Sequence, residues 1–282
     1  MEYLGYIFLV GLLFLGVLFI FNKKKVPVKY YILLAIIGGL LAAFASFMLE
    51  TFFGDILVKF LFIGNFDVND QGQMVFSSAL VFYLYYFVQH FLMVAPLEEI
   101  SKNLIAYVLN EKTEHKFLSY IECVMPYLIM GIAFSIVEDY LYIKNYDNGL
   151  MRLMIFLPGH PMFAMIFGHF YYKYRVKVEV YSIREILRRT TGEYKKFSLK
   201  ENKFIKLGLL ISCLIHGTHN FIAVTNGDLF YCMYLIELVI FVVVFVMMIK
   251  NRKRDAKKEA VEEFLKYYPE YNEERLEELG VI

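Results

Sequence analysis

Cysteine is scarce in this chain, and its three cysteines are not spaced for a disulfide framework or a thiolate metal site. Cys123, Cys213 and Cys232 are far apart among 282 residues and form no Cys-x-x-Cys pair. Lone cysteines of this kind are ordinarily apolar packing residues. An excess of charge of one sign is also missing, because 29 basic residues face 28 acidic ones and the formal net charge is +1. The composition therefore gives no indication of nucleic acid as a partner.

Three further signatures are absent from the sequence. No His-Glu-x-x-His occurs, so the strongest sequence signature of a zinc hydrolase is missing. No internal repeat is visible. The first apolar run lacks both a basic region before it and a small-residue cleavage site after it. We therefore expect this run to be a retained helix, not a signal peptide that is removed.

Apolar residues, by contrast, are abundant. The chain is 59% hydrophobic and 18% aromatic, and its mean hydropathy is +0.52, whereas a soluble domain is usually about half apolar or less. The runs LGYIFLVGLLFLGVLFIF and LIELVIFVVVFVMMI approach the length of about 20 residues that crosses a hydrocarbon core. We expect an all-α, polytopic transmembrane bundle of about seven spans, with boundaries good to about 2–4 residues, at 4–21, 30–52, 87–109, 124–143, 153–172, 205–225 and 229–249.

The basic residues predict the orientation of the bundle. The segments after the first, third and fifth expected spans are rich in lysine and arginine, as is the tail that opens KNRKRDAKK, and the intervening segments carry few. Positively charged connecting segments stay in the cytoplasm. The sequence therefore places the amino terminus outside and the carboxyl terminus in the cytoplasm, in a lipid bilayer.

Two parts of the chain are less regular. Residues 53–86 contain two apolar stretches, ILVKFLFIGNF and VFSSALVFYLYY, but a separate span there would break the alternation of charge, so we expect one of them to be an interfacial or re-entrant element. Residues 251–282 mix both charges with apolar residues at helical spacing, which indicates a solvated helix on the cytoplasmic side. The expected division is an amino-terminal region at 1–86, a polar-residue-bearing membrane core at 87–225, a last span at 226–250 and the charged tail at 251–282.

Ionisable residues recur inside four expected spans, where they are costly and are usually functional. A rise of about 1.5 Å per residue, counted from the nearest cytoplasmic basic residue, places four of them about 20 Å deep, in the outer half of the bilayer. These four are Glu98, Glu138, His160 and His216. The depth of Glu138 holds only if the fourth span begins near Pro126 and the preceding FLSYIECV lies along the interface.

Helical phase adds neighbours to this group. His216 and Asn220 are four residues apart and share a helix face, as do Glu98 and Lys102. Glu99 lies about 100° around the helix from Glu98.

The remaining histidines fit the group less well. His169 is nine residues from His160 and points in nearly the opposite direction, so we expect it to be a packing residue. His219 lies about 60° around the helix from the face that carries the group, and it could contact the group's residues from outside. His90 and His115 lie outside the group.

Two imidazoles and a carboxylate form a ligand set of catalytic zinc, which leaves the fourth position to water. His160, His216 and Glu138 supply this set in the sequence. A further carboxylate, from Glu98 or Glu99, would then take a proton from the water, as in other metal-assisted hydrolyses.

Two other residues complete this interpretation. Asn220 can donate its amide to a developing oxyanion, and Lys102 can neutralise one of the paired glutamates.

Two alternatives stay open: a buried polar network that only ties helices together, in a transporter or binding protein, and a proton or ion pathway. A pathway needs polar groups strung from one face of the membrane to the other, whereas these residues form a layer.

Four motifs of the chain resemble those of the PrsW family of intramembrane proteases. PLEEISK resembles its EExxK motif, GIAFSIVEDYLY its FxxxE segment, HPMFAMIFGHF its histidine motif and LIHGTHNF its final HGxxD/N motif. They occur in the family's order over about residues 85–225. The related CAAX prenyl endopeptidases have EExxxR instead, so the spacing of Lys102 is that of the PrsW side of this larger group, which also includes bacteriocin-processing relatives.

The resemblance implies site-1 cleavage of a single-pass membrane protein of the anti-sigma-factor type, in the cytoplasmic membrane of a bacterium. It leaves open whether zinc is bound or whether Glu98 activates water directly, with the two histidines orienting it. Many members have Asp where this chain has Asn220, which removes one possible ligand charge. The amino-terminal spans and the tail match nothing in the family's motifs. The site residues that the resemblance implies are Glu98, Glu99, Lys102, Glu138, His160, His216 and Asn220.

Overall fold

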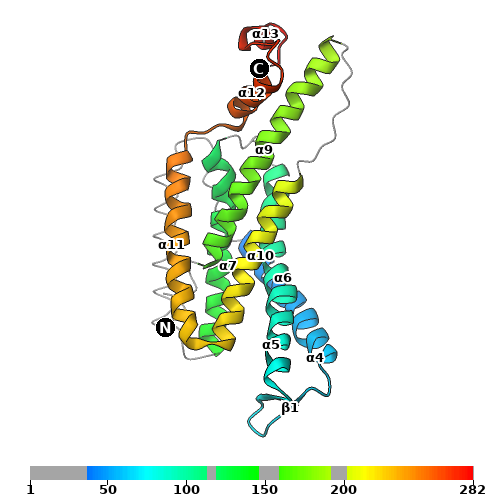
Figure 1. The fold of residues 1–282 in the computed structure, drawn as a ribbon, viewed down its shortest axis with the longest axis vertical. Helices are drawn as coiled ribbons and strands as arrows, with labels where there is room; N and C mark the ends of the chain where they lie inside the picture. The colour runs from blue at the N-terminus through cyan, green and yellow to red at the C-terminus, as the bar shows by residue number, and fades with distance from the viewer. Residues whose placement is uncertain (1–36, 113–118, 146–158, 192–201, 282) are drawn as a thin grey trace.

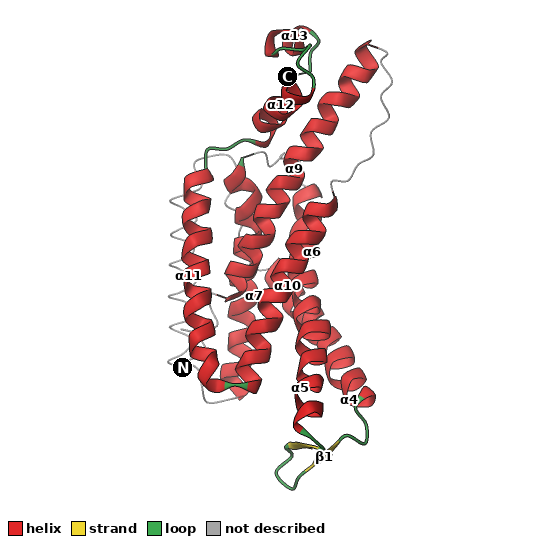
Figure 2. Cartoon of the chain, viewed as in Figure 1, coloured by secondary structure: helices red, strands yellow, loops and turns green. Residues whose placement is uncertain are grey.

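The computed structural model describes residues 37–112, 119–145, 159–191 and 202–281 (Figure 1). These residues are almost entirely helical, apart from one short hairpin (Figure 2). The elements, in order, are α3 (Gly39–Leu49), the π-helix η2 (Glu50–Leu57), α4 (Val58–Leu61), β1 (Phe66–Val68), β2 (Met74–Phe76), α5 (Ala79–Phe87), the π-helix η3 (Val88–Val94), α6 (Ala95–Lys112), α7 (Tyr120–Asn145), α9 (Gly159–Thr191), α10 (Asn202–Thr225), α11 (Gly227–Asn251), α12 (Ala256–Tyr267) and α13 (Glu273–Glu278).

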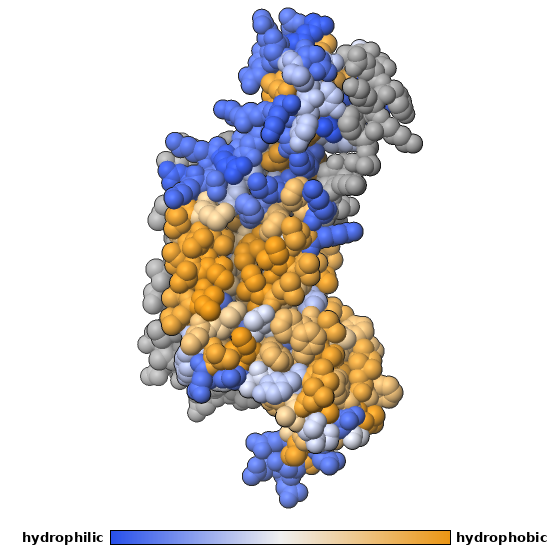
Figure 3. Space-filling model, viewed as in Figure 1, coloured by the Kyte–Doolittle hydropathy of each residue, from blue (hydrophilic) through white to orange (hydrophobic). Residues whose placement is uncertain are grey.

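The prediction of an all-α, multi-pass membrane protein is confirmed. Among the described residues, five helical stretches are long and apolar enough to cross a membrane: Gly39–Leu61, Ala79–Val108, Tyr120–Tyr140, Lys203–Thr225 and Gly227–Asn251. An apolar band covers the middle of the visible face, with hydrophilic surface at both ends (Figure 3). The expected span 4–21 lies outside the described residues. The count of seven and the orientation of the termini stay predictions.

The expected fifth span, 153–172, corresponds to the start of α9. This helix of 33 residues carries charges along its second half and is not among the five apolar stretches. Its first half nevertheless lies deep in the bundle, where Met162, Phe163 and Met165 are buried. Neighbouring protein, more than lipid, surrounds this part of α9, so it needs no long apolar run.

Residues 53–86 lengthen the two neighbouring spans on either side of a short hairpin, and an interfacial or re-entrant role within 53–86 stays a prediction. The apolar residues on either side of the hairpin extend the neighbouring helices: the second expected span continues to Leu61, and the third begins at Ala79. The hairpin pairs Phe66 with Phe76 in antiparallel register. Ser78 caps the start of α5 by accepting a hydrogen bond from the amide of Val81.

The expected start of the fourth span near Pro126 is wrong. Helix α7 runs without a break from Tyr120 to Asn145 and contains Pro126 inside it. A proline in a helix interior loses one backbone hydrogen bond and normally costs stability. Helices of membrane bundles tolerate proline because close neighbours hold them in place, and the residues around Pro126 are fully buried against such neighbours.

Helices α7 and α9 form the centre of the bundle, and their contact depends on glycine. A Cβ atom on Gly131 of α7 would lie 2.6 Å from the backbone oxygen of His160 on α9. One on Gly168 of α9 would lie 3.0 Å from the Cα of Val124 on α7. Small residues let membrane helices approach this closely. The backbone position of His160 is therefore set by its contact with α7.

The tail is not the solvated helix that its sequence indicated. Helix α12 buries Ala260, Val261 and Phe264 in the same core as Val180 and Ile183 of α9. In Figure 1 it lies beside α9 at the end of the bundle where α11 ends. The apolar residues at helical spacing therefore form a docking face, and only the opposite face of α12 is exposed.

Polar contacts fix the position of α12 on α9. The Tyr172 hydroxyl donates to Glu259 at 2.7 Å, Arg254 binds the same carboxylate, and Lys177 pairs with Glu263. Burial raises the pKa of Glu259, but the hydrogen bonds from Arg254 and Tyr172 outweigh it and hold that pKa below its usual value. A carboxyl with a lowered pKa stabilises the folded state above its unfolded pKa, and this stabilisation is lost as the pH falls.

We expect Phe264→Ala to release the tail. Truncation of a fully buried phenylalanine costs about 3–5 kcal/mol, and Phe264 is 1% exposed. The measurement is the rate of limited proteolysis within residues 251–282 in detergent. Glu262→Ala, on the exposed face of the same helix, is the control and should leave the rate unchanged. Equal rates for the two variants would show that the docked face does not hold the tail.

Candidate metal centre

The paired glutamates lie where a π-helix gives way to an α-helix. Residues 79–112 form one continuous helical segment, and η3 occupies its middle, directly before Ala95 and Pro96. Proline has no amide hydrogen to donate and crowds the carbonyl four residues before it, which accounts for a local change of helical register here. Glu98 and Glu99 follow in the first turn of α6, where neighbouring helices bury them.

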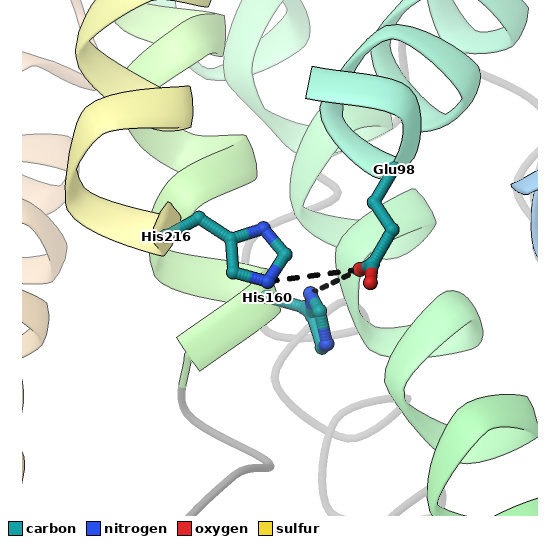
Figure 4. A group of neighbouring side chains, drawn as sticks. All are labelled: Glu98, His160 and His216. Carbon is teal, nitrogen blue, oxygen red and sulfur yellow. Dashed lines mark ion pairs between the residues drawn. The ribbon is translucent and has the colours of Figure 1, made fainter. Parts of the chain in front are cut away.

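Three side chains from three helices converge at this point (Figure 4). Glu98 comes from α6, His160 from the described start of α9, and His216 from the middle of α10. The Glu98 Oε2 atom lies 3.8 Å from His160 Nδ1 and 3.7 Å from His216 Nε2. One ligand atom from each of the three residues lies within 4.8 Å of the others. All three residues are at most 5% exposed.

The second nitrogen of each ring is held by a carboxylate. His160 Nε2 lies 2.6 Å from Glu138 Oε2, and His216 Nδ1 lies 2.9 Å from Glu99 Oε1. A ring nitrogen that donates to a carboxylate leaves the other nitrogen unprotonated. These hydrogen bonds therefore assign the tautomer in which the nitrogen facing Glu98 can accept a proton or bind a metal. A carboxylate behind each imidazole is the usual outer arrangement of a histidine-ligated metal site.

Lys102 and Asn220 contact the same inward-facing nitrogens. Lys102 Nζ lies 2.8 Å from His160 Nδ1 and 2.6 Å from Glu99 Oε1. The Asn220 amide nitrogen lies 3.2 Å from His216 Nε2. Both donors therefore satisfy ring nitrogens that would otherwise be buried without a partner, and both would have to release them for a ligand to bind.

The donor set fits a divalent cation. Within the described part of the chain, Glu98 Oε2 is buried and has no hydrogen-bond partner, although three nitrogens surround it at 3.7–3.9 Å. These separations are too long for hydrogen bonds, so the oxygen is available to a ligand. Three carboxylates (Glu98, Glu99, Glu138) face one ammonium, Lys102, so two negative charges are left over. A bound divalent cation or added protons would neutralise them in this low-dielectric site.

All seven residues that the sequence analysis singled out lie in this one network. The structure groups them differently from the expected ligand set, however. Glu98, not Glu138, lies with the two histidines, and Glu138 contacts the outer side of the His160 ring. The roles of the seven residues stay predictions.

The other histidines lie elsewhere. His169 contacts the Tyr120 hydroxyl at 2.9 Å, away from the group. His219 pairs with Glu237 of α11 at 2.7 Å, and both residues are buried. His90 lies in η3 with its ring stacked on Tyr86. His115 lies outside the described residues.

Sequence reasoning missed three contributors to the polar centre. Asn103 donates to Glu99 Oε2 at 3.3 Å and is one helical turn beyond it, a spacing that could have revealed it. Phe134 of α7 places its ring 4.5 Å from the Lys102 ammonium. Glu50, held by the Ser46 hydroxyl, is close enough to Glu98 to interact with it electrostatically. Only tertiary packing brings Glu50 here, because it lies at the end of another expected span.

The fold and the site together define a class of protein: a multi-pass helical membrane protein with a buried glutamate–histidine–histidine group suited to a metal ion. Residues 26–248 match the PrsW family intramembrane metalloproteases, which is well over half of the chain. The chain therefore belongs to the PrsW family and is an intramembrane protease. Neither the search of curated proteins nor that of solved structures found a match.

We expect Gly131→Ala to displace His160. The added Cβ would meet the His160 backbone oxygen at 2.6 Å and the Ala164 Cβ at 2.9 Å, so α9 has to shift. A displacement of about 1 Å in a catalytic group can cost about a hundredfold in rate. Proteolytic rate and thermal unfolding temperature should both fall.

The matched control is Gly159→Ala, next to His160 in the same turn. Among the described residues, a Cβ there meets only the Phe163 ring, at 3.6 Å, which is an ordinary contact. If Gly131→Ala has the same unfolding temperature and rate as this control, the contact between α7 and α9 does not position His160.

Proposed function

We propose that this chain hydrolyses a peptide bond of a membrane-anchored protein, with Glu98, His160 and His216 as the ligands of a divalent cation such as zinc. The single observation that carries the proposal is the pair of carboxylates behind the histidines, which turns the unprotonated nitrogen of each ring toward Glu98. A purely structural network would not need to leave Glu98 Oε2 without a hydrogen-bond partner among the described residues. When bound, the cation would polarise the substrate carbonyl and make water more acidic.

The roles of Glu98 and Glu138 differ from those first expected. Glu98 lies at the centre and Glu138 behind a ligand, so we assign Glu138 to orienting His160 and fixing its tautomer. Glu99 does the same for His216. Lys102 compensates the charge of Glu99, to which it is closest.

The chain's own residues can also carry the proton transfers. Water adds to the substrate carbonyl carbon and gives a proton to a carboxylate, and the same proton passes to the departing amine as the C–N bond breaks. Glu98 Oε2 is the carboxylate oxygen best placed to accept it if no metal is bound, because it faces both imidazoles. The Asn220 amide, released from His216, can donate to the oxyanion that forms in between.

Finer statements about orientation, membrane and substrate belong to the same proposal. The basic segments support an amino terminus outside and the tail in the cytoplasm, with the site nearer the outer leaflet. The motifs support a bacterial cytoplasmic membrane, a single-pass substrate of the anti-sigma-factor type, and site-1 cleavage in regulated intramembrane proteolysis. A reporter fused after Lys250 and labelling of the Asn226–Gly227 turn would test the orientation.

We expect Glu98→Gln to abolish cleavage of a single-pass substrate in proteoliposomes. The amide keeps the shape of the side chain but neither accepts a proton nor carries charge to a metal, and loss of a general base alone costs about 10²–10⁴-fold in rate. The folded protein should remain, because removing one of several buried negative charges relieves a desolvation cost.

The control is Glu237→Gln, which alters a buried carboxylate that pairs with a histidine outside the metal group. It should retain most of the activity per folded molecule. Equal activity of Glu98→Gln and Glu237→Gln, at matched unfolding temperature, contradicts the proposed mechanism.

Metal removal separates the two versions of the mechanism. With a bound ion, dialysis against a zinc chelator should stop cleavage and lower the unfolding temperature, since an ion that binds only the folded state stabilises it. Added zinc should restore both, and His216→Ala should lower the metal content measured by mass spectrometry. Full activity after verified metal removal would overturn the metal version and leave the Glu98 base.

A further inference from the structure

A row of aromatic side chains joins α5 and η3 to α10 near the polar centre. Tyr83, Phe87 and Phe91 follow one another at intervals of four residues, so they share one face of α5 and η3. This face meets α10 at Phe221, whose ring centroid lies 6.4, 6.5 and 5.9 Å from theirs. We call the contact between these three residues and α10 the aromatic seam.

The seam adjoins the catalytic face of α10 directly. Phe91 packs on Gly217, where a Cβ would lie 2.8 Å from its ring. Gly217 is next to His216, and Phe221 is next to Asn220, which bonds His216. A gate at Phe91 or Phe221 would therefore open beside the turn of α10 that carries His216 and Asn220.

A substrate needs such an opening, because the centre is closed in this structure. The three ligand residues, Glu99 and Lys102 are at most 5% exposed, whereas Asn220 is partly exposed. Glu138, on the other side of His160, is the second partly exposed member of the group. Among the described residues, the side of Asn220 adjoins exposed apolar residues of α5 and of the α10–α11 connection.

These exposed apolar residues lie on two diverging parts of the fold. Helix α5 exposes Leu80, Tyr83 and Phe87, and the α10–α11 connection exposes Val224 and Leu229. In Figure 2, α5 diverges from the lower ends of α10 and α11. We call the exposed apolar residues on these two diverging parts the wedge.

We propose that the wedge receives the membrane-spanning segment of the substrate and that the aromatic seam is the gate through which its peptide reaches the centre. The proposal rests on the proposed function. The apolar side chains suit a hydrophobic helix, and the continuity of the wedge with Asn220 places the end of that helix beside the site. The π-helical register of η3 favours gate movement, since π-helical stretches are rare and are often found at functional sites.

The first test measures binding alone. The probe is a synthetic single-span peptide of about 24 residues, long enough to cross the hydrocarbon core, in nanodiscs that contain the full chain. Phe87 is replaced by photoreactive p-benzoylphenylalanine, and Val243, an exposed residue of α11, is replaced in the same way as the control.

We expect several-fold more peptide adduct at position 87 than at position 243, and we expect unlabelled peptide to compete it away. Equal adduct at the two positions, adduct with lipid only, or adduct with a second copy of the chain would overturn the proposal.

The second test holds the gate shut. In a background with Cys123, Cys213 and Cys232 replaced by alanine, Phe87→Cys with Phe221→Cys is joined by a short thiol cross-linker that can be reduced. Phe66→Cys with Phe76→Cys, which ties the hairpin strands, is the control. Cross-linking of the seam pair should lower cleavage by about tenfold or more, as for other closed substrate gates, and reduction should restore it.

The two tests distinguish failure of the gate from failure of the proposed function. Undiminished cleavage by the cross-linked seam pair overturns the gate, while the protease stands. If the parent cleaves no membrane protein but position 87 captures the peptide, the proposed function fails, while the wedge remains a binding surface for a membrane-spanning helix.

Discussion

The hydrogen bonds from two carboxylates to two imidazoles are the interactions on which the polar centre depends. Glu138 holds His160 and Glu99 holds His216, and each bond sets both the tautomer and the rotation of its ring. The bonds join α7 to α9 and α6 to α10, so they also tie four helices together. Loss of either carboxylate would leave a ring without its partner in a buried site, where unpaired polar groups are costly.

The surroundings of Glu98 and Glu99 explain the charges of the string EEISK. Glu99 is surrounded by Lys102, Asn103 and His216, so its negative charge is well satisfied. Glu98, by contrast, is a buried carboxylate whose Oε2 lacks a hydrogen-bond partner within the described residues. Adjacent residues on one helical turn thus have different environments. One supports the site, and the other is available to a ligand, a proton or a metal ion.

The wrong sequence predictions have a common cause. Each considered one segment alone and left out the helix that packs against it. Pro126 was expected to end a helix, yet α7 continues through it because α9 packs against both sides of that position. The tail was expected to be solvated, yet Val261 and Phe264 find an apolar face on α9. The depth argument for Glu138 rested on the supposed break at Pro126, and it reached the right neighbourhood from a wrong premise.

The sequence by itself determined the helical membrane class and the set of polar residues. Long apolar runs indicate membrane-spanning helices, and charged residues inside such runs are costly and usually functional. The four motifs also indicated the PrsW family. Tertiary structure decided which carboxylate faces the two histidines, since Glu98 and Glu138 lie in different helices and neither spacing nor phase fixes the rotation of one helix against another. It also brought Glu50 to the centre and Phe91 onto Gly217. Such contacts depend on the packing of side chains between helices, which no single stretch of sequence contains.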